Sequence, residues 1–129
     1  QLENLATIQG KRQKIWISYN NQIEGSYVKK PEVPAYATNN SHMYYLTCNN
    51  LAERKALIAH LNNNNLNAVF HYQSLHQSDF FKGSYNGQKL IESDRYSDHL
   101  VRLPFYFELS ADDISRVSNS INNFYRSRA

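Results

Sequence analysis

Three stretches of the chain repeat apolar residues every three or four positions, the spacing of an amphipathic helix. The first covers residues 2–25, and its apolar positions are Leu2, Leu5, Ile8, Ile15, Tyr19 and Ile23. The second covers 51–61, follows an Asn50–Glu53 pair typical of a capping box, and ends in the asparagines at 62–65. The third follows a Ser110–Asp113 pair of the same type. Its predicted buried stripe is Ile114, Val117, Ile121, Phe124 and Tyr125.

Three short apolar runs between these helices are predicted to be strands. They cover 42–48, 68–71 and 100–103. A polar loop at 73–90 and a short helix at 91–99 complete the order of elements. Pro31 and Pro34 exclude a helix through the segment that contains them. Because helices alternate with short strands, the predicted fold class is α/β, a small sheet packed against helices in a single domain, 1–129.

The composition limits the class of protein. A chain of 129 residues and 15.1 kDa, 41% hydrophobic, fits one core of moderate size. No apolar run approaches the ~20 residues of a membrane helix, so we expect no membrane partner. The expected location is the cytoplasm, because a single cysteine favours a reducing compartment. The single cysteine, Cys48, excludes an internal disulfide and is predicted to be a small core residue.

The charge is mildly basic, with a formal net charge of +3 and a pI of about 9.0. The lysines and arginines are spread along the chain and form no dense basic stripe, so nucleic acid is not the expected partner. Ten tyrosines and six phenylalanines suit a packed core or interface, but they would also suit base stacking. A free-standing α/β module that binds nucleotides or RNA is therefore the alternative, and a structural domain that dimerises through its first helix is a third hypothesis.

The strongest candidate for a functional site is the segment 68–76. Its apolar strand leads directly into His71, Tyr72 and His76, and α/β proteins place polar groups at a cleft in this way. These side chains could orient the phosphate or hydroxyl groups of a ligand, or move a proton, because histidine titrates near neutrality. The alternative is a strand end whose polar residues are simply solvated. His42 would join them if its strand and theirs are neighbours.

Other chemistry has less support in the sequence. Two histidines without a nearby cysteine or a well-spaced carboxylate do not predict a metal site. The chain has no glycine-rich phosphate loop and no Walker motif. Ser97, Asp98 and His99 are the residue types of a hydrolytic triad, but neighbours on one helix point in different directions and cannot form it locally.

Several segments, in chain order, resemble the DegT/DnrJ/EryC1/StrS family of sugar aminotransferases. They are Gln1–Leu5 with Lys11 and Arg12, His42–Leu46, Glu53–Leu61, Asn65–His76, and Ser97 with Leu100–Ser110. The most specific matches are Ala-Val-Phe-His-Tyr at 68–72 followed by Leu75-His76, and Arg-Leu-Pro at 102–104. The chain departs from the family pattern at Gln73-Ser74, where an apolar–proline pair is usual, and through 77–89, which leaves the sugar open.

The resemblance implies an enzyme that uses pyridoxal 5'-phosphate (PLP) to transfer an amino group from glutamate to a keto-sugar nucleotide. The closest subgroup has dTDP-4-amino-4,6-dideoxygalactose as its product and serves surface polysaccharide or lipopolysaccharide (O-antigen) synthesis. The chain would be the C-terminal small domain of the fold-type I aminotransferase architecture. Its partners would be its own large domain and a second subunit of a homodimer.

The same resemblance implies how the site is divided. The lysine of the Schiff base, the acid on the pyridine nitrogen and the phosphate-binding groups would belong to the large domain, which this chain lacks. No catalytic or cofactor-binding residue is therefore expected in the chain, and the fragment alone is expected to be inactive. His71, Tyr72 and His76, with His42 as a further candidate, would face the sugar-nucleotide side of the cleft and position the substrate.

Overall fold

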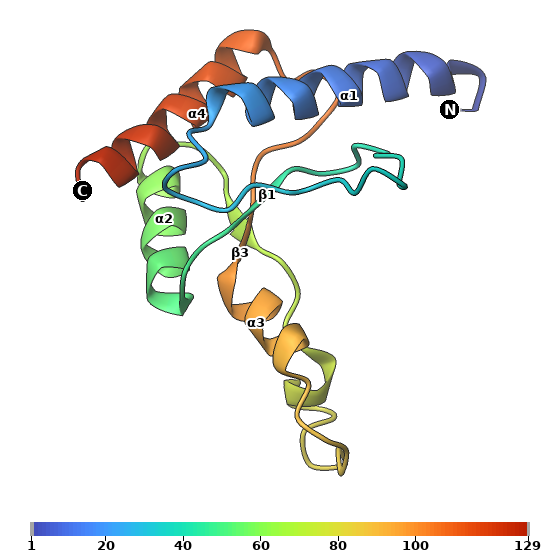
Figure 1. The fold of residues 1–129 in the computed structure, drawn as a ribbon, viewed down its shortest axis with the longest axis vertical. Helices are drawn as coiled ribbons and strands as arrows, with labels where there is room; N and C mark the ends of the chain where they lie inside the picture. The colour runs from blue at the N-terminus through green and yellow to red at the C-terminus, as the bar shows by residue number, and fades with distance from the viewer. Residues whose placement is uncertain (1, 129) are drawn as a thin grey trace.

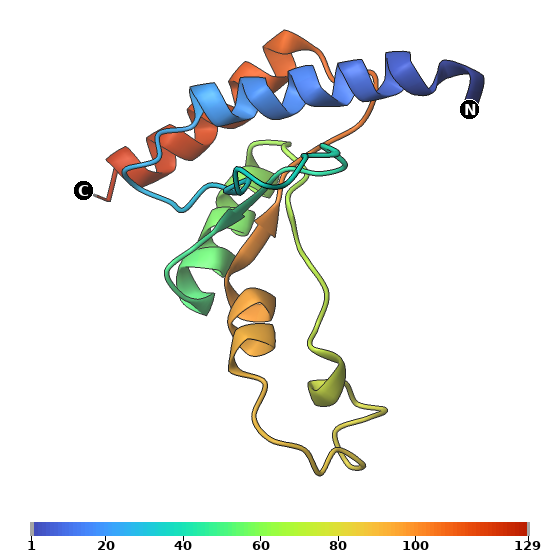
Figure 2. The ribbon, with the colours of Figure 1, turned by 45° about the vertical axis from the view of Figure 1, so that its right-hand side comes forward.

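The computed structural model describes residues 2–128, without the side chain of Leu2, so the expectations for Gln1 and for the Leu2 side chain lie outside the described part. In chain order the elements are a 3-10 turn Leu2–Asn4, α1 Leu5–Gln22, β1 Tyr45–Thr47, α2 Leu51–Asn63, β2 Val69–Phe70, a 3-10 turn Leu75–Gln77, α3 Ile91–His99, β3 Leu100–Arg102 and α4 Ala111–Arg126. α1 and α4 pack against each other on one side of the sheet, and α2 lies beside the sheet (Figure 1). Residues 73–98, called the arm below, extend away from this body (Figures 1 and 2).

The sheet has the strand order β1-β3-β2, and both outer strands run antiparallel to β3. Arg102 on β3 pairs with Tyr45 on β1 and with Val69 on β2. The small sheet packed against helices is therefore as predicted. The strand after His42 and the strand before His71 are not neighbours, however, because β3 lies between them.

The first strand is shorter than predicted and leaves His42 in a turn. The Asn39 side chain accepts a hydrogen bond of 2.9 Å from the backbone N–H of Ser41, whose φ of 48° is left-handed. The Asn40 side chain accepts from the N–H of His42 at 3.4 Å. These local bonds compete with strand pairing, so the ladder begins only at Tyr45.

The core lies between the sheet and the helices, and α4 contributes the stripe that its sequence predicted. Its five predicted apolar residues are all buried. Both capping interactions are present as well: the Ser110 side chain accepts from the N–H of Asp113 at 3.1 Å, and that of Asn50 accepts from the N–H of Glu53 at 2.9 Å. Asn65, just beyond α2, has the left-handed φ of 58° expected where a helix ends in asparagine.

The predicted buried face of the first helix holds only for its second half. Ile15, Tyr19 and Ile23 are buried, and the Tyr19 and Tyr44 rings lie 5.3 Å apart in the core. Leu5, in contrast, is 51% exposed, because the N-terminal half of α1 extends beyond α4 (Figures 1 and 2). No helix within residues 2–128 is long and apolar enough to cross a membrane.

Candidate functional site

His71 directly follows β2 and is half-buried. Its Nδ1 is buried and has no hydrogen-bond partner among the described residues, which leaves Nε2 as the ring nitrogen that can meet a ligand. Burial lowers the pKa of His71 below its usual range, and electrostatic interactions with Arg102 and His42 lower this pKa further. The imidazole is therefore neutral at pH 7 and can either accept a hydrogen bond or take up a proton.

Tyr72 lies against His71, with ring centroids 4.5 Å apart, and is 72% exposed. Arg54, on α2, supports the strand before this pair: its guanidinium lies 5.4 Å from the Phe70 ring and donates to the carbonyl of Ser97. The end of β2 is thereby held against α2 and α3, and it presents an imidazole and a phenol side by side.

His76 occupies a separate place, on the arm. Its Nε2 lies 3.0 Å from Oδ1 of Asp94 on α3, and its side chain is only 10% exposed. Its ring centroid lies 5.2 Å from that of Tyr85. Gly87 lies so close to the Tyr85 ring that a Cβ at this position would be 2.6 Å from it. Because glycine has no side chain, the Tyr85 ring has room to lie beside His76. Of the three residues predicted from segment 68–76, the structure thus places His71 and Tyr72 together and His76 against Asp94 and Tyr85.

His42 lines a groove of about 460 Å³ between the N-terminal half of α1 and residues 105–108. Its Nδ1 lies 2.7 Å from Oδ1 of Asn40, which fixes the ring. Arg12 and Glu108 bring opposite charges to the same groove. Sequence reasoning missed this groove, because its walls come from segments almost 100 residues apart.

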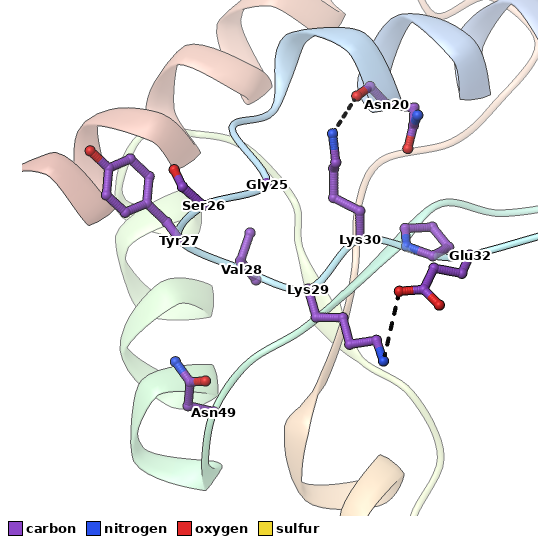
Figure 3. Close-up of a pocket in the computed structure, with 10 residues that line it drawn as sticks. Asn20, Gly25, Ser26, Tyr27, Val28, Lys29, Lys30, Glu32 and Asn49 are labelled. Atoms are coloured by element: carbon purple, nitrogen blue, oxygen red, sulfur yellow. Dashed lines mark hydrogen bonds and ion pairs between the residues drawn. The ribbon is translucent and has the colours of Figure 1, made fainter.

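Three hollows larger than this groove contain none of the predicted site residues. One of about 610 Å³ lies beside the turn after α1 (Figure 3). Its two lysines are already engaged: Lys30 donates to the carbonyls of Asn20 at 2.8 Å and Ile23 at 3.2 Å, and Lys29 lies 3.9 Å from Glu32. Lys30 therefore caps the C-terminus of α1, which is a structural role.

The cationic side chains give little support to the nucleic-acid alternative. Several lysines and arginines are paired with carboxylates: Lys29–Glu32, Lys82–Asp79, Arg95–Glu92, Arg116–Asp113 and Arg126–Glu24. Residues 2–128 also contain no group of three or more histidine, cysteine, aspartate or glutamate side chains arranged to hold a metal ion.

Cys48 is buried in the core beside Tyr125, as its sequence context predicted. Burial raises the pKa of its thiol to about 11, so the thiolate needed for nucleophilic chemistry is scarce at neutral pH. Tyr125 in turn donates a hydrogen bond of 2.7 Å to Glu53. This cluster connects α4 to α2 and gives no sign of a reactive cysteine.

The family model for DegT/DnrJ/EryC1/StrS aminotransferases matches residues 1–122, nearly the whole chain. The chain belongs to this family. The match covers the second strand with His71 and Tyr72, the arm with His76, and the turn with His42, so all the candidate positions lie within the shared pattern.

Solved structures of aminotransferases have the same fold. The aminotransferase TlmJ from Streptoalloteichus hindustanus superposes with a TM-score of 0.88 at 20% identity, over 100% of this chain and 35% of that one. A DegT/DnrJ/EryC1/StrS aminotransferase from Brucella abortus superposes with a TM-score of 0.82 at 25% identity, over 96% of this chain and 33% of that one. The PLP form of a putative sugar aminotransferase, Spr1654, from Streptococcus pneumoniae superposes with a TM-score of 0.84 at 17% identity, over 100% of this chain and 34% of that one. The chain therefore spans about a third of the length of these proteins.

The hollow beside the turn after α1 does not fit PLP, the cofactor named for the Streptococcus relative. A cofactor site needs an accessible lysine for the Schiff base and an acid at the pyridine nitrogen. In the hollow beside the turn after α1, Lys30 is held by backbone carbonyls and Lys29 lies beside Glu32 at the surface. No cofactor chemistry is therefore assigned to the side chains of this hollow.

Proposed function

We propose that this chain is the C-terminal small domain of a PLP-dependent aminotransferase that aminates a keto-sugar nucleotide. The observation that carries the proposal is the family match over 1–122 in a chain that spans about a third of its solved relatives. In the complete protein, the other two-thirds would hold the cofactor, which supplies the electron sink for amino transfer when bound. Glutamate would be the amino donor.

The substrate we propose is of the dTDP-4-keto-6-deoxyhexose type, and the product would be dTDP-4-amino-4,6-dideoxygalactose. Such a product would enter surface polysaccharide or lipopolysaccharide (O-antigen) synthesis in the cytoplasm. The segments at 68–76 and 100–110 support the family to which this subgroup belongs, and the choice of sugar rests on the resemblance of the chain to the subgroup.

In this proposal, His71 and Tyr72 bind the sugar nucleotide and orient it toward the missing domain. A neutral imidazole beside an exposed phenol offers one acceptor and one donor to the hydroxyl groups of a sugar. His42 and His76 would contact other parts of the same ligand. These residues would act by positioning, since a misplacement of about 1 Å can reduce a rate by about two orders of magnitude.

Exposed apolar residues support large contacts with the rest of the protein. Leu5 on α1 and Phe80 on the arm, which is 93% exposed, are costly to leave in water. We propose that the large domain and the second subunit of a homodimer cover these two surfaces. A dimer formed through α1 is the competing possibility, and in that case a Leu5→Lys variant of the full-length protein would lose its dimeric mass.

The proposal is tested by kinetics of the full-length enzyme with the keto-sugar nucleotide as the varied substrate. His71→Gln is expected to raise KM for the nucleotide by about tenfold, the effect of losing one hydrogen bond to a ligand. His99→Gln, a matched substitution at the end of α3, should leave KM unchanged. Equal KM values for His71→Gln and the parent would remove His71 from the substrate site.

A further inference from the structure

The contact between His76 and Asp94 joins two segments of the arm that are eighteen positions apart in the sequence. Nε2 of His76 and Oδ1 of Asp94 are 3.0 Å apart, with side chains 10% and 31% exposed. The imidazole also lies beside the Tyr85 ring, at a centroid distance of 5.2 Å. The imidazole is thus confined by a carboxylate on one side and an aromatic ring on another.

Neighbouring serines hold the two segments in register. Ser93 donates to the hydroxyl of Ser74 at 3.2 Å, and the backbone N–H of Ser74 donates to the hydroxyl of Ser97 at 3.3 Å. These bonds connect α3 to the start of the turn that carries His76. These serine hydrogen bonds therefore help to set the position of Asp94 relative to His76.

The carboxylate of Asp94 needs a partner at this place. Its Oδ1 is buried, and no described donor is aligned with it for a hydrogen bond, so the imidazole lies at the right distance but is turned away from the ideal angle. A buried carboxylate oxygen without a hydrogen bond is unfavourable. Hydrogen bonds at binding sites are often poorly aligned before the ligand is present and tighten in the complex.

We propose that Asp94 is a positioning residue for His76. Its carboxylate accepts the Nε2–H of the imidazole, which fixes that tautomer and directs Nδ1 toward the substrate as an acceptor for a sugar hydroxyl. This inference rests on the proposed function, because it takes the keto-sugar nucleotide as the ligand. Asp94 itself does not touch the substrate.

The test uses the full-length enzyme and separates the two proposals. Asp94→Asn is expected to raise KM for the keto-sugar nucleotide by about tenfold while kcat changes less than about twofold. Asp94→Glu, which keeps the carboxylate, should recover most of the lost affinity. Asp98→Asn, the same charge change at an exposed position one turn further along α3, should have no effect.

A double-mutant cycle decides whether Asp94 acts through His76. In a His76→Gln background, Asp94→Asn should add less than about a twofold change. Fully additive effects, or an unchanged KM in Asp94→Asn together with a raised KM in His76→Gln, would overturn the inference and leave the proposed function intact. An unchanged KM in His76→Gln would instead remove His76 from the substrate site.

Discussion

Asn122 on α4 binds the backbone of Gln22 at the end of α1, although 100 residues separate them. Its Nδ2 donates to the carbonyl of Gln22 at 2.9 Å, and its Oδ1 accepts from the N–H of Glu24 at 3.0 Å. The last carbonyls of a helix have no partner within the helix. The buried amide of Asn122 therefore caps α1 and fixes its packing against α4.

Replacing Asn122 with alanine should destabilise the domain. The variant leaves one backbone donor and one acceptor without their partners, which costs about 1–3 kcal/mol of unfolding free energy. Urea denaturation of the 129-residue chain measures the change. Asn119→Ala, at an exposed position on the same helix, should cost less than about 0.5 kcal/mol. Similar losses in both variants would show that the capping bonds contribute nothing specific.

The cap of α4 allows a second test of stability. Ser110→Ala removes the side-chain acceptor for the N–H of Asp113 and should weaken the first turn by about 0.5–2 kcal/mol, whereas Ser110→Gly should cost only a few tenths. Amide hydrogen exchange at residues 111–114 measures this locally. Equal protection in the two variants would contradict the capping role.

The lowered pKa of His71 makes stability depend on pH. The unfolded chain binds a proton on this histidine at a higher pH than the folded chain does, so acidification favours unfolding. The contribution is complete above the unfolded value of about 6.5 and is lost as the pH falls below it. His71→Asn should therefore lose less unfolding free energy than the parent between pH 7.5 and pH 5. Parallel pH profiles would contradict the lowered pKa.

Cys48 should react slowly in the folded protein. Burial limits access to its thiol and raises the pKa of the thiol to about 11. A colorimetric thiol reagent at pH 8 should label it slowly in buffer and quickly in denaturing urea. Immediate labelling without denaturant would show that the core around Tyr125 opens readily.

The sequence predicted the helices well where capping and apolar spacing agreed, as in α4 with its Ser110–Asp113 box and five buried residues. It predicted strands at the right places but too long. The apolar run that marks a strand in the sequence is longer than the two or three residues that pair in the sheet. The apolar positions of α1 did not reveal that Leu5 is exposed, since apolar spacing is the same whether a helix faces its own core or another domain.

Only the site residues that are neighbours in the sequence could be predicted to lie together. His71 and Tyr72 are adjacent in sequence and remain adjacent in space. The partner of His76 was not predictable, because a polar loop without helical or strand periodicity does not define where Asp94 will lie. The groove beside His42 depends on the packing of α1 against residues 105–108, which no local pattern encodes.

We propose that this chain supplies one part of an aminotransferase whose cofactor is bound elsewhere in the protein. The most direct measurement compares the full-length protein with residues 1–129, each incubated with PLP, glutamate and a dTDP-4-keto-6-deoxyhexose, with the amino sugar detected by mass spectrometry. We expect the amino sugar from the full-length protein and none from residues 1–129. Formation of the amino sugar by residues 1–129 alone, or its absence from a full-length protein that has bound PLP, would contradict it.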